Sequence, residues 1–203
     1  MDAGGGTPML IVCAEEAQVE AELVGGLLGC PSCREVLGPW GHARVRVLRC
    51  AAGDRLLVPR RARCRGCLGT HVLLPEVVLL RRQDEVAVIG EAIEASVAGE
   101  GHRRIAERLG VPAATVRGWL RRFVERAEQV RVLFTRCAVA LDLMLGSVLP
   151  AGSGVADALE VIAVAARAWV LRFGRRPVWQ IVSRLSAGGL LSRNTSSLAT
   201  GPW

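Results

Sequence analysis

The sequence predicts a mainly α-helical protein that carries one small β-rich segment in its N-terminal half. Two CxxC pairs, at 30–33 and 64–67, flank a stretch in which apolar and basic residues alternate, as expected for β-strands. Residues 102–121 are typical of two short helices joined by a tight turn. Apolar residues then recur at steps of three and four as far as residue 148, which predicts further helix.

Composition and charge limit the classes of function. With 203 residues, of which 51% are hydrophobic, the chain can bury a sizeable core. All 26 basic residues are Arg, and the formal net charge is +7. Residues 30–126 hold 18 of these Arg against ten acidic residues, whereas residues 1–29 hold five acidic residues and no Arg. Positive charge concentrated on one segment is typical of a module that binds a polyanion.

The expected location is the cytoplasm. The N-terminal residues lack the basic start and the long apolar run of a signal peptide. The apolar stretches 137–149 and 155–171 are too short for a transmembrane span or are interrupted by charged residues, so we expect no membrane association. In the cytoplasm, seven cysteines are expected to be metal ligands or buried thiols rather than disulfides.

Residues 1–29 are expected to form an N-terminal unit with a short buried strand at 9–14 and a helix at 15–28. Cys13 lies in this strand and is best interpreted as a small core residue. A reactive thiol would need electropositive neighbours, and the sequence around Cys13 is acidic.

The two CxxC pairs predict a structural zinc site. Cys30 and Cys33 form the first pair, and Cys64 and Cys67 form the second. Each short loop can present two thiolates to one tetrahedral zinc ion, and the strands between the pairs complete a zinc ribbon over residues 30–75. Three nearby side chains could each replace one of these ligands, namely Cys50, His42 and His71.

Residues 84–126 are expected to form a three-helix unit. Asp84 is suited to cap the first helix, which continues to Val97. In the next two helices, Ala106 is small where the helices cross, Gly110 can adopt the left-handed turn, and Val116 fills the crossing. This spacing resembles the helix-turn-helix of DNA-binding proteins, and the unit resembles the homeodomain-like class.

The helix-turn-helix resemblance implies which residues face DNA. The groove-facing positions fall on Pro112, Ala113, Ala114, Arg117, Gly118 and Arg121. Arg117 and Arg121 can donate hydrogen bonds to guanine, whereas the two alanines can contact thymine methyl groups. Further contacts are expected from Thr115, Arg122 and Arg103, and contacts to phosphates from Arg61 and Arg63 of the ribbon.

A helical hairpin is expected over residues 127–188. The apolar repeat that begins at Val116 should continue the recognition helix to Val148, and a second repeat follows the PAGSG break at 150–154. The apolar surface of this hairpin exceeds what its two helices cover, so we expect a homodimer, with a short helix from Pro177 as the alternative cover. Residues 189–203 are expected to be a flexible tail.

The CPSC and CRGC knuckles, together with the motif IAERLGVPAATVRGWL, resemble the zinc-ribbon and helix-turn-helix head of bacterial transposases. Uncharacterised actinobacterial proteins with this head and a helical tail are similar too. The resemblance covers residues 30–123. It implies DNA binding that serves a mobile element or transcriptional control, as in a transcriptional regulator. It does not imply strand transfer, because the acidic residues after the head lie in helical sequence, without strands to gather them around paired metal ions.

The sequence therefore predicts a non-enzymatic, dimeric protein that contains structural zinc and binds double-stranded DNA with sequence preference, without a small-molecule substrate. Two alternatives stay open. One is a protein-interaction module, or a catalytically inactive transposase remnant, that acts through the helical hairpin. The other is a nuclease or recombinase whose catalytic residues the sequence does not reveal.

Overall fold

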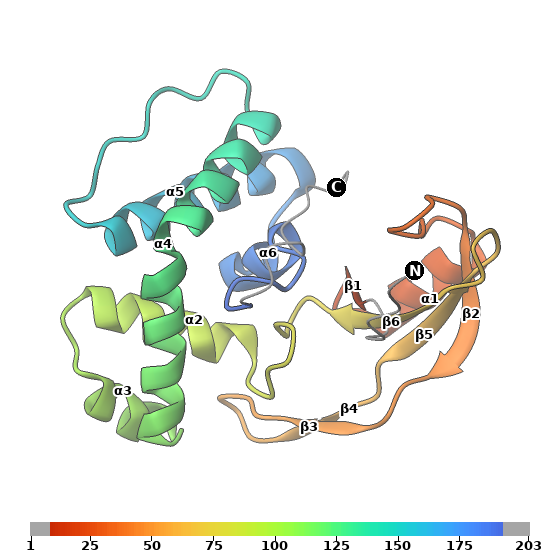
Figure 1. The fold of residues 1–203 in the computed structure, drawn as a ribbon, viewed down its shortest axis with the longest axis horizontal. Helices are drawn as coiled ribbons and strands as arrows, with labels where there is room; N and C mark the ends of the chain where they lie inside the picture. The colour runs from red at the N-terminus through yellow and green to blue at the C-terminus, as the bar shows by residue number, and fades with distance from the viewer. Residues whose placement is uncertain (1–8, 193–203) are drawn as a thin grey trace, which may run out of the picture.

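The computed structural model describes residues 9–192, which form a β-rich N-terminal part and a helical C-terminal part (Figure 1). The first part contains β1 (Met9–Val12), α1 (Glu16–Val24), β2 (Leu37–His42), β3 (Arg46–Leu48), β4 (Arg55–Leu57), β5 (Arg60–Cys64) and β6 (Thr70–Pro75). The second contains α2 (Val86–Val97), α3 (His102–Leu109), α4 (Ala113–Leu141), α5 (Gly154–Phe173) and α6 (Val178–Leu185). The predicted combination of helices with a small β segment is confirmed.

The main sheet has four strands in the order β1-β6-β5-β2. β2, β5 and β6 are antiparallel neighbours, whereas β1 pairs in parallel with β6, from Met9 opposite Val72 to Val12 opposite Pro75. The N-terminal strand therefore belongs to the same sheet as the ribbon. α1 covers one face of this sheet through Val19 and Leu23.

A two-stranded arm, formed by residues 43–58 and containing β3 and β4, extends from the β2–β5 pair towards the helical part (Figure 1). The sequence between Arg55 and Cys64 forms two strands, β4 and β5, because Pro59 between them has no N–H to donate to a ladder. β2 was not predicted, because Gly and Pro dominate its sequence LGPWGH.

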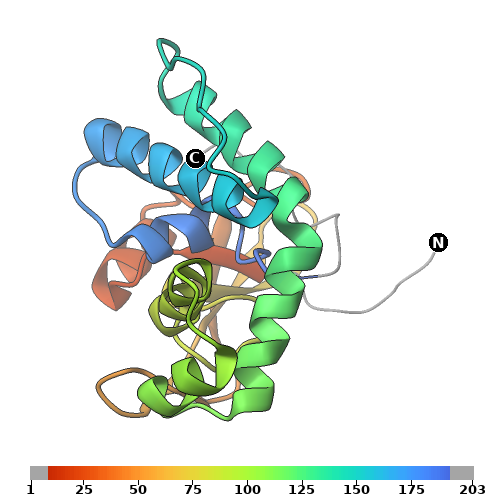
Figure 2. The ribbon, with the colours of Figure 1, turned by 90° about the vertical axis from the view of Figure 1, so that its left-hand side faces the viewer.

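The helices α2 to α6 share one hydrophobic core that extends from Leu79 to Leu191. Figure 2 shows α4 as the longest helix, with α2 and α3 beside its first half and α5 across its second half. α4 thus spans the expected recognition helix and the first helix of the expected hairpin without a break. No helix within residues 9–192 is both long and apolar enough to cross a membrane.

The end of α4 differs from the prediction, because the helix stops at Leu141 and not at Val148. The Asp142 Oδ1 atom accepts a hydrogen bond of 3.0 Å from the backbone N–H of Met144, an Asx turn that competes with helix. Residues 142–153 then connect to α5, which Ser153 caps by accepting from the Ala156 N–H at 3.2 Å. The connection is therefore longer than the expected five-residue break.

Asp84 does not cap α2, because the N-cap residue is Glu85, which makes no side-chain cap hydrogen bond. Asp84 is instead buried, and its Oδ2 atom accepts a hydrogen bond of 3.0 Å from Arg49 of the arm. The backbone supports this contact, since Arg49 N donates to Gln83 O and Glu85 N donates to Arg49 O. Asp84 therefore attaches the arm to the start of the helical part.

α6 begins after Pro177, as predicted, and packs on α2. The ring of Trp179 lies so close to Gly90 that a Cβ atom there would be 2.0 Å from it, so the contact requires glycine. The expected flexible tail is wrong at its start, because Leu190 and Leu191 are buried in the helical core. The rest of that tail, from residue 193, lies outside the described residues.

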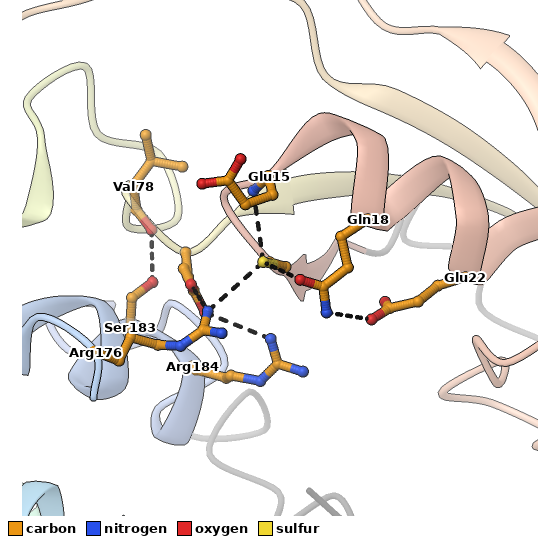
Figure 3. Close-up of polar contacts among 9 residues, drawn as sticks. Glu15, Gln18, Glu22, Val78, Arg176, Ser183 and Arg184 are labelled. Carbon is orange, nitrogen blue, oxygen red and sulfur yellow. Dashed lines mark hydrogen bonds and ion pairs between the residues drawn. The ribbon is translucent and has the colours of Figure 1, made fainter. Parts of the chain in front are cut away.

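The buried carboxylate of Glu76 links the end of the sheet to Arg176 and Arg184, which Figure 3 labels. It pairs with Arg176 and, at 3.4 Å, with Nη1 of Arg184. Arg176 Nη1 also lies 3.6 Å from the buried Cys13 Sγ atom, although the two residues are 163 positions apart. Cys13 is a core residue as predicted, but its cationic neighbour could not be inferred from the local sequence.

Candidate metal centre and nucleic-acid interface

Two knuckles bring four thiols together at one end of the sheet. The Sγ atoms of Cys30, Cys33, Cys64 and Cys67 all lie within 4.8 Å of one another. The Cys30–Cys67 distance is 3.7 Å and the Cys33–Cys64 distance is 3.3 Å, so each of these contacts joins one knuckle to the other. Two ligands on a tetrahedral zinc with Zn–S bonds of about 2.3 Å would be about 3.8 Å apart. The cluster therefore has the size that one bound metal ion requires.

The two knuckles share one backbone conformation. The residue after the second cysteine of each pair has a positive φ, 65° at Arg34 and 59° at Leu68. This left-handed region favours glycine, and neither position holds one. The knuckles are held in place by hydrogen bonds from Cys30 N to Glu35 O at 2.8 Å and from Cys64 N to Gly69 O at 2.9 Å.

Backbone N–H groups stabilise the thiolate of the first cysteine in each knuckle. Burial raises the pKa of Cys64, but the N–H groups of Cys67 and Gly66 and the Cys33 thiol together lower that pKa to about 7. Burial likewise opposes the N–H groups of Cys33 and Ser32, which lower the pKa of Cys30. Thiolates at these distances repel one another, and a bound metal cation would remove that repulsion.

The three alternative ligands take different positions. His71 is buried, and its Nε2 atom lies 3.3 Å from Cys30 Sγ, so it touches the cluster through one cysteine. The Cys50 thiol lies in the arm and donates to Leu48 O at 3.6 Å. His42 is exposed at the end of β2. Among the described residues, only the four cysteines form a group that could hold a metal ion.

The second candidate site is built by α2, α3 and α4. Ala106 and Val116 are buried where α3 and α4 meet, and Gly110 between these helices has a φ of 63°. The Val111 N–H donates to Ala106 O at 3.0 Å and closes the turn. Ala106 and Val116 thus lie at the helix crossing, and Gly110 lies in the turn, as the sequence motif predicted.

Residues 82–131 match the family model of a homeodomain-like domain. The match includes α2, α3 and the first part of α4. No curated protein and no solved structure matches the chain. The homeodomain-like domain is therefore the part of the chain for which a known family supports DNA binding.

Most of the predicted DNA-facing residues of the homeodomain-like domain lie on one surface. These residues form the α4 wall of a cleft of about 760 Å³. They are Ala114, Thr115, Arg117, Gly118, Arg121 and Arg122. Ala113 is instead half-buried against the helical core, while Pro112 is exposed before α4 and Arg103 is exposed on α3. The opposite side of the cleft is formed by residues 81–84, whose sequence carries no functional signal.

The cleft-lining arginines of α4 differ in their present partners. Arg117 is exposed. Arg121 lies 3.6 Å from the Glu125 carboxylate, in an exposed pair that costs little to break. Arg122 donates from Nη1 to Gly118 O at 2.9 Å. All three can therefore offer N–H donors to an anion in the cleft.

The ribbon arginines are partly engaged within their own domain. Arg61 donates to Thr70 Oγ1 at 3.4 Å, and Arg63 donates to Leu68 O at 3.3 Å. The Arg63 guanidinium also lies 4.6 Å from the centroid of the exposed Trp40 ring. Arg44, by contrast, is exposed on the arm. The arm thus presents a more available cation than β5 does.

Proposed function

We propose that the protein binds double-stranded DNA with sequence preference through its homeodomain-like domain. The observation that carries the proposal is the match over residues 82–131 together with the arginine-lined face of α4. Arg117 and Arg121 lie one helical turn apart, so both can enter one major groove and donate to guanine O6 and N7. Ala114 is exposed beside them and can contact a thymine methyl group.

We further propose that the metal of the four-cysteine cluster is zinc and that its role is structural. Four thiolates favour zinc over magnesium or calcium, which prefer oxygen ligands. Four protein ligands also leave no open position for a substrate or a reactive water. The ion would fix the two knuckles and, through the sheet and arm, support the position of the homeodomain-like domain.

The biological setting that we propose is transcriptional control or a function linked to a mobile element, without an enzymatic activity of the chain itself. The acidic residues of α4 and α5 support the non-enzymatic part of this proposal. Glu125 and Glu128 are exposed on α4, and Glu160 is exposed on α5. These positions resemble solvated helix faces rather than a site that gathers carboxylates around paired metal ions.

A protein-interaction module is the second candidate function, and one observation favours it. The connection between α4 and α5 exposes Leu143, Met144 and Leu149 by 84%, 92% and 79%, respectively. Large apolar side chains at one exposed connection are typical of a surface that contacts another protein.

Binding to genomic duplex fragments, measured with the zinc-loaded full chain, tests the proposed function. We expect affinity tighter than micromolar at low salt and a steep loss of affinity as salt rises, because phosphate contacts release counterions. Failure to bind any duplex under these conditions would exclude the proposed function in favour of the interaction module. Metal-dependent cleavage of the fragments would instead reveal a nuclease.

A further inference from the structure

The cleft beside α4 contains an unusual concentration of arginine. Arg117, Arg121 and Arg122 line it from α4, and Arg81 and Arg82 line it from the connection between β6 and α2. Among the described residues that line this cleft, Asp84 is the only acidic one. The volume of the cleft, about 760 Å³, is comparable to that of small-molecule sites. The cleft can therefore admit a phosphate group with its neighbouring atoms.

The carboxylate of Asp84 balances this charge only in part. It is 2% exposed and accepts a hydrogen bond from Arg49, which approaches from the arm. Burial raises the pKa of Asp84, although Arg49 acts in the opposite direction. The five arginines of the cleft are therefore left without a free acidic partner among its lining residues.

The surroundings of Arg82 disfavour its positive charge. Its Nη2 atom donates to Leu191 O at 3.2 Å, but its buried Nε atom has no hydrogen-bond partner within residues 9–192. Burial, followed by the nearby charge of Arg122, lowers the pKa of Arg82, and Asp84 opposes this only in part. Both effects disfavour a cation at this position, and a bound anion would reverse them.

The backbone that carries Arg81 and Arg82 is fixed from two sides. Arg81 has a φ of 60°, a left-handed conformation that persists in a non-glycine residue only where the surroundings impose it. Leu80 N donates to Gly188 O at 2.9 Å, and the arm contributes the bond from Arg49 N to Gln83 O at 2.7 Å. The second wall of the cleft is thus held in place before any ligand binds.

We propose that this cleft binds a phosphate group of the DNA backbone, between Arg81 and Arg82 of the connection and Arg122 of α4. The inference rests on the proposed function and extends the DNA interface beyond the recognition helix. Planar guanidinium groups pair with phosphate oxygens through two hydrogen bonds, which suits a site built from several arginines. A free polyphosphate offers the same chemistry, so the test has to separate these two sources.

The first measurement compares wild-type protein, Arg81→Gln and the matched control Arg136→Gln on several duplexes of different sequence across a salt series. Arg81 is exposed, and glutamine keeps the same backbone requirement, so the variant should fold normally. We expect Arg81→Gln to weaken binding to all duplexes by a similar factor and to lower the salt slope by about 0.9, the value for one phosphate contact. Arg136, exposed on the second half of α4, should behave as wild type.

An unchanged salt slope for Arg81→Gln, with wild-type duplex binding intact, would overturn the cleft proposal and leave the proposed function standing. The second measurement titrates inorganic pyrophosphate into complexes of duplex with the same three proteins. Pyrophosphate that competes with duplex for wild-type protein, and competes less for Arg81→Gln, supports the cleft. Pyrophosphate binding by a protein that binds no duplex would overturn both the proposed function and the DNA source of the phosphate.

Discussion

Arg126 is a buried cation on α4, and it shows how one residue can oppose the stability of the fold. It is 7% exposed, and its Nε and Nη2 atoms have no hydrogen-bond partner in the described part of the chain. Burial lowers the pKa of Arg126, because it disfavours the charged form. Donors that are buried without a partner cost about 1–3 kcal/mol each.

We therefore expect Arg126→Met to increase the free energy of unfolding by about 1 kcal/mol or more, because an apolar chain of similar length removes the buried charge. Urea denaturation measures this change. Arg136→Met, at an exposed position of the same helix, should alter stability by less than about 0.5 kcal/mol. A less stable Arg126→Met protein would show that Arg126 makes a favourable contact.

Single residues were predictable where one chemical requirement decides their identity. The four cysteines had to meet around one ion, and Gly110 had to adopt a positive φ in the turn. Asp84 was misassigned as a cap because its partner, Arg49, lies 35 positions away. Glu76 and Arg176, which are 100 positions apart, gave no local signal for the same reason.

At the scale of elements, the knuckles contain a strain that a single substitution can relieve. Leu68 is 58% exposed and has a φ of 59°, so its side chain contributes little packing while its backbone is in a region that favours glycine. We expect Leu68→Gly to stabilise the ribbon by about 1 kcal/mol. Leu68→Ala is the matched control, because it removes the side chain but keeps the strain. Equal thermal midpoints for the two variants would show that the backbone at Leu68 is not strained.

The metal centre makes a second prediction for the ribbon. Purified protein should contain about one zinc per chain, and a chelator should reduce the ordered structure of the ribbon. Cys64→Ser should lose the metal, whereas Cys137→Ser should keep it, because Cys137 is buried in the helical core. Metal analysis and circular dichroism measure both effects. A metal-free protein with an unchanged fold would exclude a structural metal.

Elements were predictable where the pattern repeats over several turns. α4 was inferred over most of its length, because its apolar residues recur in one periodic series up to Leu141. The same series predicted helix beyond Leu141, where the Asx turn at Asp142 takes over. β2 was missed because its pairing with β5 depends on the knuckles that it connects rather than on strand propensity.

At the scale of the whole molecule, the expected homodimer stays a prediction. α5 and α6 cover much of the apolar surface that a partner was expected to cover, but Leu143 and Met144 stay exposed. We expect light scattering to report a dimer, and the double variant Leu143→Ser, Met144→Ser to report a folded monomer. Since both side chains are exposed, this change should not disturb the core. A wild-type monomer would contradict the prediction.

In the proposed interface, Arg117 and Arg121 of α4 read the DNA sequence, whereas the other arginines contact only phosphates. A binding selection from a pool of random duplexes, followed by affinity measurements on the preferred site, tests this division of roles most directly. Arg117→Ala should cost about 1–3 kcal/mol on that site and relax the choice of one base. Arg44→Ala, on the arm, should weaken all duplexes alike. An Arg117→Ala protein that folds and selects the same sequence as wild type would contradict this division of roles.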